Sequence, residues 1–162
     1  MDNKKVAVIG SGLMGGGIAQ ACAQSGLEVT VVDVAQEPLD KAHALVAKLL
    51  QKKVEKGKLG QDDADATLAR LSYTTDYARI AGAAHVIEAV PERLDFKRAT
   101  FQKMDEFADA GATLLTNTSG INIDDIAAAT TRPADVLGMH FFYPAPVMRL
   151  VELIRGKKTS DE

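Results

Sequence analysis

The chain has 162 residues and lacks several features that mark particular classes of protein. Its single cysteine, Cys22, excludes an internal disulfide framework, fits a reducing compartment and is predicted to be a buried thiol on a helix. No run of about 18 apolar residues is present, so we expect no membrane-spanning helix. The weakly basic start runs straight into a glycine-rich stretch, which is unlike a secretory leader. We therefore expect a cytoplasmic protein with no membrane partner.

An excess of charge of one sign is also absent. The formal net charge is −3, which gives no electrostatic preference for nucleic acid, and we expect no nucleic-acid partner. We expect no metal site either, because His43 falls on a predicted helix surface, His85 begins an apolar strand, and no Cys/His cluster exists. What the chain does have is 46% hydrophobic and 25% charged residues, which is typical of one soluble globular domain with a real core.

Short apolar runs alternate with helical patterns along almost the whole chain. The predicted strands cover residues 5–9, 27–33, 71–76, 84–91, 112–119, 134–142 and 146–154. The predicted helices cover residues 13–25, 36–56, 62–71, 93–108 and 121–130. This alternation indicates an α/β fold of the Rossmann type, with a doubly wound, mainly parallel sheet and helices on both faces. Such sheets bind ligands at the carboxyl ends of their strands.

Residues 10–15 read GSGLMG, a G-x-G-x-x-G pattern placed between a predicted strand and a predicted helix. Gly10 allows the tight turn, Gly12 lets a pyrophosphate approach the backbone, and Gly15 lets the helix pack close to the strand. Leu13 and Met14 begin the helix, where free N–H groups and the positive end of the helix dipole attract phosphates. The pattern predicts a dinucleotide-binding site.

An acid at the end of the second strand strengthens this prediction. Asp33 follows Gly15 by 18 residues, and a carboxylate there can accept hydrogen bonds from the adenosine ribose. It would repel a 2′-phosphate, and Val34 follows it with no nearby arginine, so we expect NAD rather than NADP. The alternative is that the glycines only shape a turn and that Asp33 caps a loop or helix.

A cofactor fingerprint does not define a reaction, which must come from the polar residues near later strand ends. These candidates are Glu92, Lys97, Asn117, Ser119, His140 and Glu152. After His140, Pro144 and Pro146 break the backbone, and the next extended segment could bring Glu152 back beside the imidazole. Such a pair is suited to take a proton from an alcohol as hydride leaves the same carbon. From spacing alone, a catalytic His140 and a structural one are equally open.

Four segments carry a resemblance to a known family: VAVIGSGLMGGGIAQ, VIEAVPE, NTSGINI and GMHFFYPAPVMRLVE. In this order they closely resemble the L-3-hydroxyacyl-CoA dehydrogenase family, and the resemblance covers residues 4–162. It implies an enzyme of fatty-acid metabolism that uses NAD to oxidise an (S)-3-hydroxyacyl-CoA to the 3-ketoacyl-CoA, or runs in reverse. The implied partner is therefore an acyl-CoA substrate.

The resemblance also implies roles for individual residues. His140 matches the general acid/base, Glu152 the residue that orients it, and Ser119 a catalytic residue near both nicotinamide and substrate. Lys56 matches a lysine that meets the coenzyme A moiety, although a solvated helix end is the alternative reading of its cluster with Lys52 and Lys53. The cofactor-binding residues expected in this half of the chain are Ala89, Glu92, Lys97, Asn117, Ser119 and Tyr143.

Two departures from the family pattern stand out. Tyr143 occupies the position of a common asparagine that reaches cofactor and substrate, and it can narrow the pocket or stack on a ligand. The family also has a second, all-helical domain that supplies the dimer interface and part of the acyl-CoA pocket. We therefore expect residues 1–155 to form the NAD-binding domain and 156–162 to begin a linker to a helical domain that this chain lacks, with a full-length homodimer formed through that domain.

Other functions stay open at this point. The chain could be an isolated NAD-binding module with little or no turnover. It could also be a structural or lens-type protein that retains nucleotide binding, or a dehydrogenase of free hydroxy acids that does not use coenzyme A.

Overall fold

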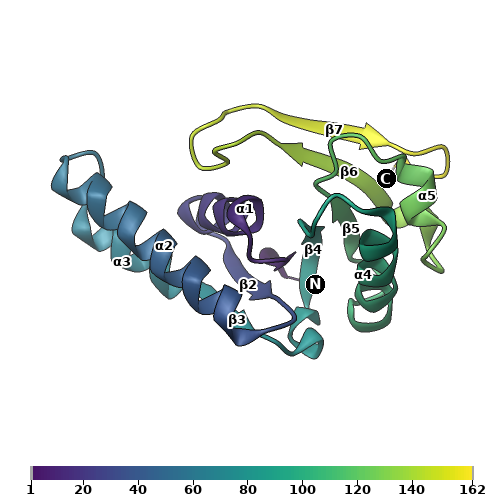
Figure 1. Cartoon of the computed structure of the whole chain (residues 1–162), viewed down its shortest axis with the longest axis horizontal. Helices are drawn as coiled ribbons and strands as arrows, with labels where there is room; N and C mark the ends of the chain where they lie inside the picture. Colours follow the sequence, from purple (N-terminus) through teal and green to yellow (C-terminus); the bar gives the residue numbers. More distant parts are fainter. Residues whose placement is uncertain (1, 162) are drawn as a thin grey trace.

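The computed structural model describes residues 2–161 and is built around one seven-stranded sheet (Figure 1). The strand order is β3-β2-β1-β4-β5-β6-β7, in which β7 runs antiparallel to β6 and every other neighbouring pair is parallel. The strands are β1 (Asp2–Ile9), β2 (Glu28–Val32), β3 (Leu71–Thr74), β4 (Ala83–Glu88), β5 (Thr113–Thr116), β6 (Val136–Phe141) and β7 (Val151–Arg155). The predicted mainly parallel Rossmann-type α/β fold is confirmed.

Helices cover both faces of this sheet. They are α1 (Leu13–Gln24), α2 (Gln36–Glu55), α3 (Gln61–Ala69), α4 (Leu94–Phe107) and α5 (Ile123–Ala127), with 3₁₀ turns η1 (Tyr77–Ile80) and η2 (Pro133–Asp135). Helices α1 and α2 pack on one face, and α4 and α5 pack on the other. The α2–α3 hairpin projects away from the sheet in Figure 1.

Strand β1 shows how the sequence creates two cores. Its side chains alternate between the faces, so Val6 and Val8 join the cluster under α1 and α2, while Ala7 and Ile9 join the cluster under α4 and α5. All four are almost fully buried. A continuous apolar run therefore predicts a central strand that is covered on both faces, as in other parallel sheets.

The predicted strand at 146–154 is wrong in its first half. Strand β7 begins only at Val151, and the preceding residues form the turn that follows the cis peptide bond between Tyr143 and Pro144. The Val147 and Met148 N–H groups both donate to the Pro144 carbonyl within this turn, so they are not available to a strand ladder. The two 3₁₀ turns were not predicted from the sequence; in η1 the Asp76 side chain accepts a hydrogen bond from the Ala78 N–H.

Cys22 lies on α1 and packs, partly buried, against the core on that face. Burial raises the pKa of its thiol to about 11, so the group is protonated at neutral pH. A protonated thiol is unreactive, which is typical of a structural cysteine. His43 and His85 are both exposed. Within residues 2–161, no helix is long and apolar enough to cross a membrane, and no group of three or more His, Cys, Asp or Glu residues could hold a metal ion.

The last described residues fold back onto the domain. The Thr159 hydroxyl donates to the Val136 carbonyl over 2.7 Å, and the Ser160 N–H donates to the Ala134 carbonyl over 2.9 Å. The Lys157 N–H donates to Asp124 Oδ1 over 2.8 Å, at the start of α5. The division after residue 155 stays a prediction, and the structure adds that residues 156–160 hydrogen-bond to the same body.

Candidate functional site

The glycine loop joins β1 to α1 and cannot carry side chains at its first and last glycines. Gly10 has φ 98°, and a Cβ there would lie 2.8 Å from the Ala89 carbonyl oxygen. A Cβ on Gly15 would lie 1.8 Å from the Gly10 carbonyl oxygen. These two glycines therefore serve the tight turn and the close helix–strand packing for which the sequence motif predicts them.

Gly12 is different because it faces open space. A Cβ at this exposed residue would meet no atom within 4 Å. Gly12 is also the N-cap of α1, whose first turn has no side-chain cap and no acidic residue. The free N–H groups and the positive end of the helix dipole are therefore open to an anion, and a phosphate can approach the backbone where any side chain would block it.

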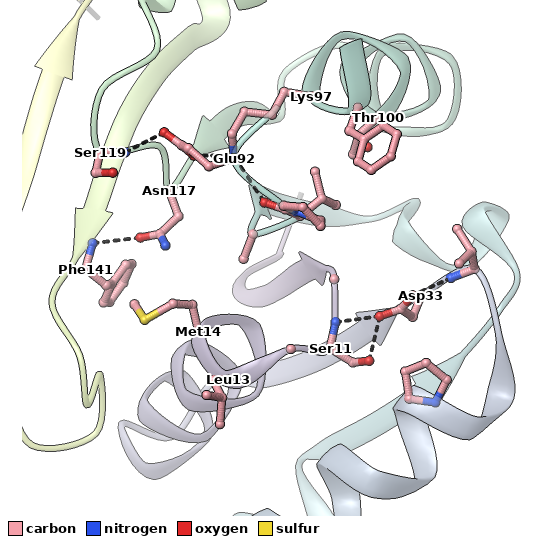
Figure 2. Close-up of a pocket in the computed structure, with 18 of the residues that line it drawn as sticks. Ser11, Leu13, Met14, Asp33, Glu92, Lys97, Thr100, Asn117, Ser119 and Phe141 are labelled. Atoms are coloured by element: carbon pink, nitrogen blue, oxygen red, sulfur yellow. Dashed lines mark hydrogen bonds and ion pairs between the residues drawn. The ribbon is translucent and has the colours of Figure 1, made fainter. Parts of the chain in front are cut away.

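Asp33 follows β2 and bonds to the glycine loop (Figure 2). Its Oδ2 accepts from the Ser11 N–H over 2.7 Å and from the Ser11 hydroxyl over 2.6 Å, while Oδ1 accepts from the Val34 N–H over 2.7 Å. Ser11 was not singled out from the sequence, since the middle position of the motif has no fixed chemistry. The carboxylate is thus fixed beside the loop, where it can accept ribose hydroxyls and repel a 2′-phosphate.

A cavity of about 1060 Å³ lies along the carboxyl ends of the strands. Its volume is at the upper end of the range for small-molecule sites, which is roughly 300–1,000 Å³. All of the expected cofactor-binding residues line it except Gly15, which is buried beneath the loop. The lining members of that set are Gly10, Gly12, Leu13, Met14, Asp33, Ala89, Glu92, Lys97, Asn117, Ser119 and Tyr143.

A buried ion pair supports the middle of this cavity. Lys97 on α4 donates to Glu88 Oε1 over 2.7 Å, and the two side chains are 1% and 0% exposed. Glu88 ends β4, and its other oxygen accepts from the Thr116 hydroxyl over 2.7 Å. The Val90 N–H also donates to Glu88 Oε1 over 2.7 Å. Every oxygen of the buried carboxylate is therefore satisfied, as a charge at this depth requires.

The charge of Lys97 also reaches Glu92, whose Oε2 lies 3.3 Å from Lys97 Nζ. Partial burial alone would raise the pKa of Glu92, but the hydrogen bond from the Thr118 hydroxyl and the charge of Lys97 together lower the pKa below its usual value. Glu92 Oε1 accepts that hydroxyl and also the N–H groups of Ser119 and Gly120. Glu92 is thus ionised at neutral pH and holds the loop that carries Ser119.

Sequence reasoning named Glu92 and Lys97 but missed Glu88 and Thr116. The signal for Glu88 was available, because an acid inside the apolar run HVIEAV is a buried charge that must have a partner. Thr116 had no comparable signal, since threonine is common in strands for packing reasons alone.

The predicted contact between His140 and Glu152 is present in the structure. The two residues face each other directly across the β6–β7 ladder, and His140 Nδ1 lies 2.9 Å from Glu152 Oε2. The His140 ring also packs at a tilt against Phe142, with ring centroids 4.7 Å apart. The histidine side chain is 19% exposed and the glutamate 51%. With Nδ1 directed at the carboxylate, Nε2 is the nitrogen available for proton transfer.

A second cavity of about 440 Å³ shares lining residues with the first. His140 and Ser119 line both cavities, and Glu152 lines the second. His140 is therefore in contact with both cavities.

Lys56 is not brought to either cavity. It is the exposed C-cap residue of α2, and the turn between α2 and α3 lies at the far end of the projecting hairpin (Figure 1). Tyr143 is 65% exposed at the rim of the first cavity. The roles of both residues remain predictions.

Comparison with known proteins shows the family of this chain. Residues 5–162 match the family described as 3-hydroxyacyl-CoA dehydrogenase, NAD binding domain. The chain belongs to this family. We therefore assign NAD as the cofactor, in agreement with the sequence-based expectation.

Individual proteins and solved structures are similar to this chain over almost its whole length. A probable 3-hydroxybutyryl-CoA dehydrogenase of Deinococcus radiodurans is 46% identical over 98% of this chain. The 3-hydroxyadipyl-CoA dehydrogenase of Escherichia coli is 45% identical over 97% of it. The crystal structure of (S)-3-hydroxybutyryl-CoA dehydrogenase from Ralstonia eutropha is 42% identical, covers 99% of this chain and superposes with a TM-score of 0.96. The chain spans only 56%, 33% and 56% of these three proteins.

We predict that Asp33 sets cofactor preference. The wild-type chain should bind NADH more tightly than NADPH in a fluorescence titration. Asp33→Ala should weaken NADH binding by about tenfold or more, because hydrogen bonds to a charged acceptor are lost. The variant should also show a smaller difference in affinity between NADH and NADPH than the wild type does. Tighter binding of NADPH by the wild type, or unchanged NADH affinity in the variant, would contradict this assignment.

We also predict that the Glu88–Lys97 pair is a large contributor to stability. Glu88→Gln and Lys97→Met should each lower the free energy of unfolding in urea by about 3–5 kcal/mol. Lys97→Met leaves the buried Glu88 carboxylate without its cation, and Glu88→Gln leaves buried Lys97 with only the more distant carboxylate of Glu92. The double variant should lose less free energy of unfolding than the two single variants lose together. The matched control is Lys41→Met, which removes the exposed Lys41–Glu37 pair and should cost less than about 1 kcal/mol. Single variants no worse than this control would refute the prediction.

Proposed function

We propose that the protein to which this chain belongs oxidises (S)-3-hydroxyacyl-CoA to 3-ketoacyl-CoA with NAD, or catalyses the reverse reaction. The observation that carries the proposal is the His140–Glu152 pair, whose histidine lines both the cavity of the glycine loop and the second cavity. Membership of the family and the names of its relatives support the same reaction class.

The residues of this chain divide the work in the proposed reaction. When bound, NAD accepts the hydride from the carbon that carries the hydroxyl. His140 Nε2 takes the hydroxyl proton as the carbonyl forms, and returns it in the reverse direction. Glu152, 2.9 Å from Nδ1, fixes the imidazole tautomer and stabilises its protonated form. Ser119 lines both cavities and can donate a hydrogen bond to the substrate oxygen.

Tyr143 and Lys56 are the residues that we assign to the substrate side. Tyr143, exposed at the cavity rim, is proposed to contact cofactor and substrate and to narrow the entrance. Lys56 is proposed to meet the coenzyme A moiety from the α2–α3 hairpin, with Lys52 and Lys53 in the last turn of α2 adding positive potential. No acyl chain length is implied.

We further propose that the full-length protein is a cytoplasmic homodimer with a helical domain after residue 155. An exposed apolar surface on the β6–β7 hairpin supports this, because patches of this kind mark interaction sites. We call this the hairpin surface; its members are Tyr143, Val147, Met148, Leu150, Leu153 and Ile154. The relatives' greater length and the single cysteine are consistent with the proposed domain and compartment.

A specific observation favours a second candidate for the chain by itself, an NAD-binding module with little turnover. Glu152 is half exposed, and the hairpin surface beside the dyad has no covering element among residues 2–161. Water therefore reaches the carboxylate that pairs with the proposed proton acceptor, and exclusion of water is what strengthens electrostatic contacts in a closed active site.

We predict that the chain by itself behaves as an NAD-binding module with little turnover. The 162-residue chain is mixed with acetoacetyl-CoA and NADH, and loss of NADH absorbance is followed. We expect NADH binding with weak or no turnover, and any turnover should fall by at least about 100-fold in His140→Ala, because general acid–base catalysis contributes on this scale. Glu152→Gln should keep NADH affinity while lowering the rate.

Substrate controls decide between the remaining functions. Turnover on free 3-hydroxybutyrate but not on the thioester would replace the proposal with a hydroxy-acid dehydrogenase. Turnover that survives in His140→Ala would remove His140 from the mechanism.

We also predict that the hairpin surface drives self-association of the isolated chain. Light scattering should give an average mass above the monomer value of 17.2 kDa that rises with concentration. Leu150→Glu with Leu153→Glu should restore the monomer, because both side chains are more than half exposed on the hairpin. Leu45→Glu, on the exposed side of α2, is the matched control and should leave association unchanged. A wild-type chain that stays monomeric at all concentrations would refute the prediction.

A further inference from the structure

Strand β5 is too short to support the end of β6 that carries His140. The β5–β6 ladder stops at the pair Thr116–Gly138, whereas β6 continues to Phe141. Beyond Gly138, β6 keeps ladder partners only in β7, up to the pair Phe141–Val151. The residues next to His140 therefore need another hydrogen-bond acceptor on the β5 side.

The Asn117 side chain supplies that acceptor. Its Oδ1 accepts the Phe141 N–H over 2.8 Å (Figure 2), one residue after His140. The Asn117 backbone N–H donates in turn to the Glu88 carbonyl over 2.8 Å. Asn117 thus links the end of β4 to the end of β6, through its backbone N–H on one side and its side-chain oxygen on the other. The bond to β6 lies next to the proposed proton acceptor.

The other half of the same amide is directed elsewhere. Because Phe141 offers an N–H, the amide atom that faces it must be oxygen, and this fixes the orientation of the side chain. The Nδ2 group has no hydrogen-bond partner among residues 2–161, and Asn117 lines the first cavity between Met14 and Ser119 (Figure 2). Two N–H donors are therefore available to a ligand in that cavity.

The place of Asn117 along the cavity indicates which part of the ligand it meets. Asp33 bonds to the glycine loop on one side of the cavity in Figure 2, and Phe141, the residue after His140, lies on the other. A dinucleotide with its adenosine ribose at Asp33 and its pyrophosphate at Gly12 extends its nicotinamide half toward Asn117 and His140. Oxygen acceptors of that half, the carboxamide carbonyl and the ribose hydroxyls, match the amide donors.

We propose that Asn117 is a positioning residue that couples cofactor binding to the placement of His140, with its Oδ1 holding the Phe141 N–H and its Nδ2 binding the nicotinamide half of NAD. The inference rests on the proposed function for the role of His140, but the contact with Phe141 is independent of it. When the cofactor binds, it fixes the Asn117 side chain, and the fixed side chain stabilises the end of β6. Conversely, an ordered end of β6 holds the Asn117 side chain in the orientation that binds the cofactor.

Two variants separate the halves of the amide. Asn117→Asp keeps the acceptor for Phe141 and loses the donors, while Asn117→Ala loses both. Both variants should weaken NADH binding by about tenfold in fluorescence titrations. NAD⁺ is titrated in parallel. Loss of a hydrogen-bond donor should weaken the binding of NAD⁺ and NADH alike, whereas the added negative charge of the aspartate should affect the two affinities differently.

The second measurement is hydrogen exchange of the Phe141 amide, followed by NMR on the whole chain. Without cofactor, exchange in Asn117→Asp should stay within about twofold of wild type, while in Asn117→Ala it should be about tenfold faster or more. NADH should slow Phe141 exchange in the wild type, and saturating NADH should fail to do so in Asn117→Asp. A residue with only a structural role would not separate the two variants in this way.

The outcomes are decisive. Unchanged Phe141 exchange in Asn117→Ala, or an Asn117→Asp variant that binds NADH as the wild type does and still slows Phe141 exchange, overturns the proposal. Turnover on free 3-hydroxybutyrate but not on the thioester would overturn the proposed reaction, while the exchange data would still decide whether Asn117 links the cofactor to β6.

Discussion

The buried ion pair between Glu88 and Lys97 is the interaction on which the rest of the site depends. It joins the end of the central strand β4 to the helix that covers it, and the Glu88 carboxylate also binds Thr116 on β5. From this point one branch runs through Lys97 and Glu92 to the Ser119 loop, and another runs through the Glu88 carbonyl and Asn117 to β6. Charges at this depth are costly unless fully paired, so the network is held in one arrangement.

This network lies at the switch in strand order, where β1 is flanked by β2 on one side and by β4 on the other. The connections leave the sheet in opposite directions there, and the resulting crevice receives the cofactor. The glycine loop approaches from β1, and the polar network approaches from β4 and β5. The cofactor cavity is therefore assembled from two halves of the fold, each with its own core cluster.

Much of the fold and part of the site could be predicted from the sequence. Alternating apolar runs and helical periods report burial directly, and they predicted the parallel sheet. The glycines and Asp33 were predictable because their spacing follows from local chain geometry. The bonds of Glu88 with Thr116 and of Asn117 with Phe141 join residues 28 and 24 positions apart, and no local pattern encodes such pairs. The late start of β7 was missed because Val147 and Met148 are as apolar as strand residues but lie in an exposed turn.

The antiparallel pairing of the last two strands has a consequence for how the site can change in evolution. His140 and Glu152 meet because the ladder sets them opposite each other, and not because of the chain between them. Side chains alternate faces along a strand, so a slip of one position would carry the glutamate to the far side of the sheet. Insertions and deletions can accumulate in the turn between the strands as long as the pairing is kept. The turn between the two strands can therefore change in length and sequence while His140 and Glu152 stay opposite each other.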